Sequence, residues 1–179
     1  MPDRSCGGCT ACCQVVPVRE LGLKAHQGCP HIRDILHAAG PGCGIYSKRP
    51  RSCRLWNCGW LESDWADDLR PDRCGVVVDP MLDLIKIDGV ERPAAQLWVL
   101  RGHEEDYQKD PALALILAIL RTGGVAVIWR LPDGMGRGFD LDADGKICSG
   151  IAPYSNDAEL GPSVERMARA RKLAANKAK

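Results

Sequence analysis

Cysteine thiols are the most chemically capable side chains of this chain, and they are crowded into its first third. Eight of the ten cysteines lie between residues 6 and 58. Thiolates bind soft and borderline metals, so thiols that converge on one point form a chelating site. The predicted metal ligands are Cys6, Cys9, Cys12, Cys13, Cys29, Cys43, Cys53 and Cys58.

The first four of these cysteines form one compact motif. Cys6, Cys9 and Cys12 are spaced C-x2-C-x2-C, which allows a tight turn to direct several sulfurs at one centre. Cys13 follows directly. In extended backbone, adjacent side chains project to opposite sides, so Cys12 and Cys13 are expected to serve different centres, or only one of them is a ligand.

The other four cysteines stand in distinctive local sequences. These are Cys29-Pro30, Cys43-Gly-Ile-Tyr, and Arg-Pro-Arg-Ser-Cys53-Arg, with Cys58 five residues later. Together with the C-x2-C-x2-C-C run, this order resembles the YkgJ-like cysteine-cluster family, described as a zinc- or iron-chelating CxxCxxCC domain. The resemblance covers about residues 5–60 and implies that the eight cysteines are the metal ligands. It implies nothing for the rest of the chain.

Zinc and iron both suit a set of eight thiolates. The thiolates would fill two tetrahedral all-cysteine zinc sites, or one four-cysteine iron–sulfur cluster with the other thiols structural. A close triplet completed by a distant Cys-Pro is similar to the ferredoxin arrangement. Zinc sites usually present C-x2-C pairs, which Cys43, Cys53 and Cys58 do not form. We therefore expect zinc or iron as cofactor, with a 4Fe-4S cluster as one form of the iron.

Four cations lie close to Cys53 in the sequence, and no acidic residue interrupts residues 43–58. They are Lys48, Arg49, Arg51 and Arg54. Positive charge there would lower thiol pKa values and offset the negative charge of a thiolate-ligated centre. The alternative is an anion or phosphate site formed by the same cations.

Candidate ligands outside the cysteine set are weaker. Three of the four histidines, including His26 and His31, lie in the cysteine-rich part, and with eight thiols available they are not expected to be ligands. Residues 140–147 match the start of an EF-hand loop, but Ile151 occupies the position that requires glutamate. A hairpin turn is expected there, and no calcium site.

Charge and hydropathy limit the classes of partner. The chain has 24 Lys and Arg against 23 Asp and Glu, a net charge of +1, which gives no reason to expect nucleic acid or an anionic membrane as partner. No apolar signal segment precedes Cys6, and the most apolar window, residues 112–120, is shorter than the roughly 20 residues of a membrane span. We expect a cytoplasmic protein, whose reducing surroundings keep thiols free.

Composition divides the chain into residues 1–74, a cysteine-rich metal-binding module, and residues 75–179, a small α+β region. The module is predicted to be loop-rich, with one short helix over residues 31–39, and metal binding would supply much of its folding free energy. The second region is predicted to contain strands at 75–79, 82–88, 96–100 and 125–129, a hairpin over 136–148, a buried helix at 111–120, and a C-terminal helix at 162–175.

The predicted fold class is therefore α+β, with a loop-rich, cysteine-ligated metal module packed on a small, mostly antiparallel sheet with a buried helix and a C-terminal helix. No acid–base pair, nucleophile triad or phosphate loop stands out. Cysteine-only coordination also leaves no position for a metal-bound water, so a non-enzymatic metal-binding protein is expected.

The alternative function is an iron–sulfur oxidoreductase or protein-modification enzyme, in which the cluster passes electrons and a protein serves as redox partner. A flagellin lysine methylase, which is far larger, carries a related cysteine cluster with an iron–sulfur centre. The sequence leaves open the number of centres and whether Cys74 or Cys148 takes part.

Overall fold

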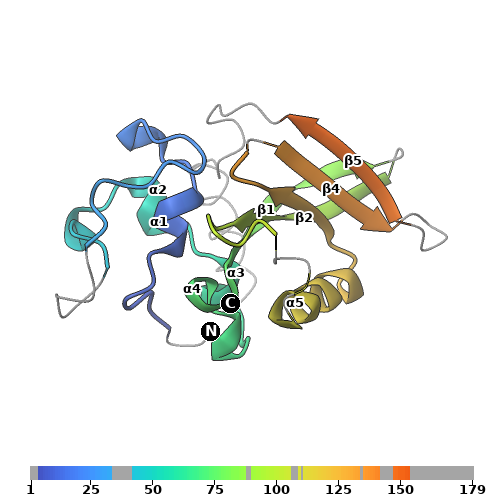
Figure 1. Cartoon of the computed structure of the whole chain (residues 1–179), viewed down its shortest axis with the longest axis horizontal. Coiled ribbons are helices and arrows are strands. Elements are labelled where there is room, and N and C mark those ends of the chain that lie inside the picture. The colour runs from blue at the N-terminus through green and yellow to red at the C-terminus, as the bar shows by residue number, and fades with distance from the viewer. Residues whose placement is uncertain are drawn as a thin grey trace, which may run out of the picture.

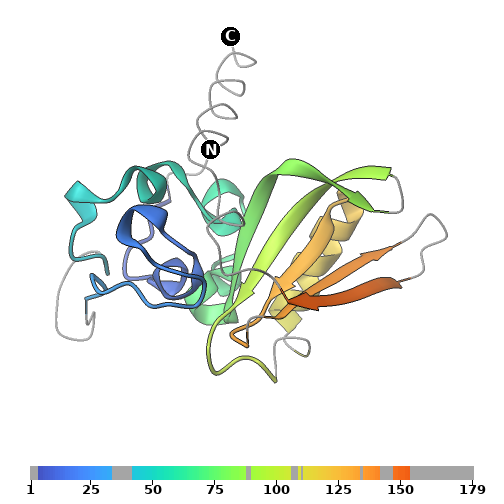
Figure 2. The same cartoon turned by 90° about the horizontal axis from the view of Figure 1, so that it is seen from above.

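A computed structural model describes residues 4–33, 42–87, 90–105, 109, 111–133, 135–141 and 147–153. The cysteine-bearing part lies beside one end of a sheet in both views (Figures 1 and 2). Its helical segments are all short. They are α1 (Ala11–Val15), η1 (Arg19–Leu21), η2 (Tyr46–Lys48), α2 (Arg51–Leu55), α3 (Gly59–Glu62), η3 (Asp67–Leu69) and α4 (Pro71–Cys74).

The sheet has five strands that are neighbours in chain order. They are β1 (Val76–Ile87), β2 (Val90–Val99), β3 (Ala126–Arg130), β4 (Met135–Leu141) and β5 (Ile147–Pro153). The β2–β3 pair is parallel and the other three pairs are antiparallel. A parallel pair needs a crossover connection, which helix α5 (Pro111–Thr122) supplies. The α+β class and the mostly antiparallel sheet are therefore confirmed.

Helix α5 covers one face of the sheet with an amphipathic surface (Figure 1). Leu113 and Ile116 are fully buried, whereas Leu115 and Ile119 are 51% and 38% exposed. A helix forms where it was predicted, but it is buried on one side only, because the sheet covers the apolar stripe that faces the core and leaves the outer face of the helix exposed. The predicted C-terminal helix, and most of the helix predicted over residues 31–39, lie outside the described residues. Among the described residues, no helix is long and apolar enough to cross a membrane.

Two predicted strands are one strand in the structure. β1 continues from Val76 to Ile87, although its pairing with β2 is irregular between Pro80 and Leu84. Proline has no N–H to donate to a sheet and is tolerated mainly at edges and bulges. β1 is an edge strand of the sheet, so Pro80 disturbs the register there without ending the strand.

One hydrophobic core joins the cysteine-bearing part to the sheet. Val15 and Trp60 from the first part belong to the same buried cluster as Val76 and Trp98 from the strands. A buried polar contact adds to this packing, because the indole N–H of Trp56 donates a 2.8 Å hydrogen bond to Oδ1 of Asp79 in β1. The segment that carries Cys53 and Cys58 is thereby anchored to the sheet.

Candidate metal centre

The first three cysteines are positioned by a tight turn followed by a helix. The amide of Cys9 donates a 2.8 Å hydrogen bond to the Cys6 carbonyl, and Gly7 within this turn has a φ of 51°. Glycine adopts that left-handed conformation without steric cost. Helix α1 then begins at Ala11, so Cys12 and Cys13 are helical. The expectation of extended backbone at this pair is wrong, and the two side chains do not project to opposite sides.

Backbone pairing brings the middle cysteines to the first motif. The amide of Cys29 donates a 2.8 Å hydrogen bond to the carbonyl of Cys13. Ile32 then forms an isolated antiparallel bridge with Cys43. Three segments that are distant in sequence therefore meet at one place.

The last two ligand candidates belong to consecutive short helices. Cys53 lies in α2, and Cys58 is the residue before α3 and is buried. The Arg4 guanidinium ties this region to the N-terminal motif, since it donates to the carbonyls of Trp60 (3.1 Å) and Trp65 (2.6 Å) and lies 4.5 Å from the Trp60 ring centroid.

Each of the eight predicted ligands lies near enough to at least one other that the charge of one thiolate raises the pKa of its neighbour. The interacting pairs are Cys6 with Cys12, Cys13, Cys43 and Cys58; Cys9 with Cys58; Cys12 with Cys13 and Cys58; Cys29 with Cys13 and Cys43; and Cys53 with Cys13 and Cys29. Four chain segments contribute to this set, which we call the thiol cluster. Its members are close enough for the charge of one to affect the next.

Burial keeps most of the thiol cluster protonated. It raises the pKa of Cys9 to about 12 and that of Cys58 to about 11. A hydrogen bond between the thiols of Cys12 and Cys13 raises the pKa of Cys12 and lowers that of Cys13 to about 7. A metal ion that binds here must therefore displace protons, because thiolates are the ligating form.

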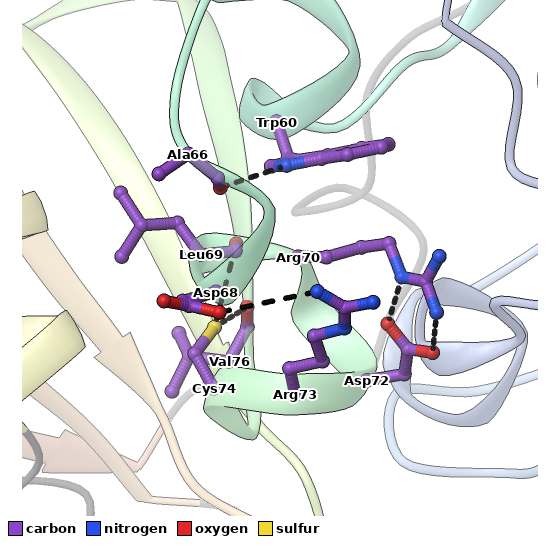
Figure 3. A network of polar contacts seen from close by, with 9 residues as sticks. All are labelled: Trp60, Ala66, Asp68, Leu69, Arg70, Asp72, Arg73, Cys74 and Val76. Atoms are coloured by element: carbon purple, nitrogen blue, oxygen red, sulfur yellow. Dashed lines mark hydrogen bonds and ion pairs between the residues drawn. The ribbon is translucent and has the colours of Figure 1, made fainter.

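Two charged residues act on the thiol cluster: Arg49, one of the four cations expected to lower thiol pKa values, and Asp72, which the sequence did not indicate. The positive charge of Arg49 acts on Cys6 and Cys13, whereas its position in the sequence suggested Cys53. The Asp72 carboxylate, from α4, interacts with the Cys9 thiol. Arg70 holds the same carboxylate with hydrogen bonds of 2.6 and 2.8 Å, as Figure 3 shows. The distance of Asp72 from Cys9 in the sequence left no signal for this contact.

Cys74 has a structural environment of its own. Its thiol is buried and donates to the carbonyls of Leu69 (3.6 Å) and Val76 (3.4 Å), at the junction of α4 and β1 (Figure 3). Cys148 lies in β5, the edge strand opposite β1 in the sheet order. Neither residue belongs to the four segments that form the thiol cluster.

The donor set fits a thiolate-bound metal in its chemistry, because it gathers eight sulfurs and a compensating arginine. The nine described cysteines form no disulfide. Within the described part of the chain, no group of three or more Cys, His, Asp or Glu side chains is arranged so that it could hold a metal ion. The thiols thus converge without forming a ligand shell.

Comparison with known proteins adds no relative. No protein-family model matches the chain, and neither a curated protein nor a solved structure is significantly similar to it. The resemblance of the cysteine motif to the YkgJ-like family therefore stays a prediction.

Proposed function

We propose that this protein binds zinc or iron through the thiolates of the thiol cluster, with an iron–sulfur cluster as one form of the iron. The observation that carries the proposal is the convergence of eight thiols from four chain segments, none of them in a disulfide. The proposed ligands are Cys6, Cys9, Cys12, Cys13, Cys29, Cys43, Cys53 and Cys58.

Binding would couple metal to the folding of this part of the chain. The thiols must lose protons and draw together, so the free energy of metal binding would stabilise helices that are too short to persist alone. Arg49 would offset part of the negative charge that the thiolates acquire. A bound zinc ion would crosslink the four segments, and an iron–sulfur cluster would also exchange electrons.

A reducing compartment suits this function. Oxidation would convert neighbouring thiols into disulfides and remove the ligands, whereas reducing cytosol keeps them available. The cytoplasm is therefore the proposed location, and a metal ion is the proposed partner. A redox partner protein follows only if the metal is present as an iron–sulfur cluster.

Anaerobic purification followed by analysis for iron, zinc and acid-labile sulfide tests the proposal, with an absorption spectrum of the same sample. Iron with matching sulfide and visible absorption would establish a cluster, and zinc without sulfide would establish a zinc centre. A chain that emerges without either metal, and does not take one up after reduction, would refute the proposal.

Two cysteine variants show whether the thiol cluster is the site. Cys13→Ser removes the thiol that interacts with Cys6, Cys12, Cys29 and Cys53, and should lower the metal content. Cys74→Ala removes a buried thiol outside the four segments and should leave it unchanged. Equal metal loss in both variants would contradict the assignment.

A further inference from the structure

Charge is distributed very unevenly over the cysteine-bearing part. Its described residues, 4–33 and 42–58, contain eight Lys or Arg and one acidic residue, Glu20. The Glu20 carboxylate accepts hydrogen bonds from the amide (2.9 Å) and hydroxyl (2.7 Å) of Ser52, at the start of α2. The carboxylate that could balance this charge is therefore already engaged with a helix N-terminus.

Five of these cations and one tyrosine lie within residues 44–54 or are hydrogen-bonded to that segment, and we call this set the basic face. They are Arg33, Tyr46, Lys48, Arg49, Arg51 and Arg54. The Arg33 guanidinium donates to the carbonyl of Gly44, two residues before Tyr46, at 3.3 Å. The Arg49 guanidinium lies 3.8 Å from the Tyr46 ring centroid. Lys48, Arg51 and Arg54 are exposed.

No described carboxylate forms an ion pair with the five cations of the basic face. The ion pairs found among the described residues are Arg70–Asp72 and Arg73–Asp68, both in the segment around α4. Within the basic face, arginine side chains instead donate to backbone carbonyls. Backbone carbonyls carry no net charge, so the positive charge of the face is not neutralised by any described carboxylate and can attract an anionic partner.

The basic face lies where a partner can reach it. Segment η2 is at the end of the cysteine-bearing part farthest from the sheet, in both views (Figures 1 and 2). The face also borders the thiol cluster, because Arg49 acts on Cys6 and Cys13 and because Cys53 lies between Arg51 and Arg54. A partner bound here would sit beside the proposed metal site without touching the sheet.

We propose that the basic face is a docking surface for a protein that presents an acidic patch. Tyrosine and arginine are enriched in the centres of protein interfaces, and here Arg49 stacks on a Tyr46 side chain that is 37% exposed. The inference goes beyond the proposed metal site, because docking depends on the cations and the tyrosine and not on the thiols.

An acidic protein fits this surface better than nucleic acid or a second copy of the chain. The segment that follows is acidic and exposed at Glu62, Asp64, Asp67 and Asp68, which would repel a long polyanion extending beyond the basic face. That same segment could meet the basic face of another copy, but such a contact is heterologous and gives either a closed ring or an open filament, not the two-fold dimer that most self-associating proteins form.

Binding of a fluorescent tetraglutamate peptide, short enough to stay on the basic face, to the full chain purified anaerobically tests the proposal. A single-stranded DNA oligonucleotide is the competitor. We expect Arg51→Glu/Arg54→Glu to weaken peptide binding by about tenfold or more, since like charges then face each other. The matched control is Lys109→Glu/Arg121→Glu, which makes the same change in net charge at exposed positions outside the basic face. The control should bind within about twofold of the unmodified chain.

A second measurement locates the contact and does not depend on charge reversal. Carbodiimide joins a lysine amine directly to a carboxylate, so peptide mapping should place the crosslink at Lys48. Tyr46→Ala should weaken binding with the net charge unchanged. Equal weakening by the two double variants, crosslinks elsewhere than Lys48, or tighter binding of the DNA than of the peptide would each overturn the proposal. Iron and zinc are measured in the same preparation, so peptide binding by a chain that holds neither metal would show failure of the metal proposal separately.

Discussion

Replacing His26 with phenylalanine should remove a pH dependence of stability that is built into the contact between the cysteine-bearing part and the sheet. His26 is 7% exposed, and its ring centroid lies 5.8 Å from that of Trp98 in β2. Neither ring nitrogen has a hydrogen-bond partner of normal geometry among the described residues. A buried imidazole that lacks a well-formed hydrogen bond is more stable neutral than charged.

The magnitude follows from the pKa of this ring. Burial lowers the pKa of His26 to about 4 from its ordinary 6.5, and the positive charge of Arg101 acts in the same direction. The Arg130 backbone and the carboxylates of Asp133 and Glu104 act weakly against it. Between these two pKa values the unfolded chain binds more protons than the folded chain. The free energy of unfolding should therefore decrease as the pH is lowered from neutral. The decrease should be about 2.5 kcal/mol at pH ~4.5 and about 3 kcal/mol at still lower pH.

Urea unfolding followed by circular dichroism, at about pH 7.5 and about pH 4.5, measures this effect. The unmodified chain should lose about 2.5 kcal/mol more stability than His26→Phe between the two conditions, since acid effects on the cysteines and carboxylates are common to both proteins. The matched substitution His31→Phe, at a half-buried histidine of the same part, controls for the loss of an imidazole as such. Equal losses in the unmodified chain and His26→Phe would refute the reasoning.

Three further perturbations have defined outcomes. Gly75→Ala should destabilise the chain by about 2 to 4 kcal/mol in urea unfolding, because Gly75 has a φ of 73° and a Cβ there would lie 2.4 Å from Nδ1 of His103; a loss below about 1 kcal/mol would contradict that geometry. Trp56→Phe should cost about 2 kcal/mol by removing the donor to buried Asp79, whereas Asp79→Asn, which keeps a carbonyl oxygen for the indole, should cost less. Treatment with a strong chelator should open residues 4–58 to trypsin before β1–β5 are cut, and first cleavage within the strands would count against metal-dependent folding.

Local patterning sufficed for most of the sheet region. The apolar run after residue 110 predicted α5, and the β-branched run at 125–129 predicted β3, because each element carries its periodicity within a few residues. The 136–148 hairpin is also confirmed as the β4–β5 pair. The continuity of β1 through Pro80 was not predictable, since it depends on the edge position of that strand, which only the assembled sheet defines.

The cysteine-bearing part was less predictable from its sequence. Helices of four or five residues, such as α1 and α2, are not stable through intrinsic propensity, so tertiary contacts decide where they form. The number and spacing of the cysteines were enough to single out the eight thiols as candidate metal ligands, because this inference needs no knowledge of the fold. The run of cations around Cys53 predicted that thiol pKa values would be lowered, but chain packing decides that Arg49 acts on Cys13. The interaction of Asp72 with Cys9 also arises from packing and leaves no local pattern.

X-ray absorption spectroscopy of the metal-loaded, anaerobically purified chain tests the central claim most directly, because it reports the atoms bound to the metal. The account predicts a shell of sulfur alone around zinc or iron, with zinc–sulfur distances of about 2.3 Å if the metal is zinc. It also predicts that sulfur is lost from this shell in Cys13→Ser and retained in Cys74→Ala. A shell dominated by nitrogen or oxygen, or one unaffected by Cys13→Ser, would contradict the assignment of the thiol cluster as the metal site.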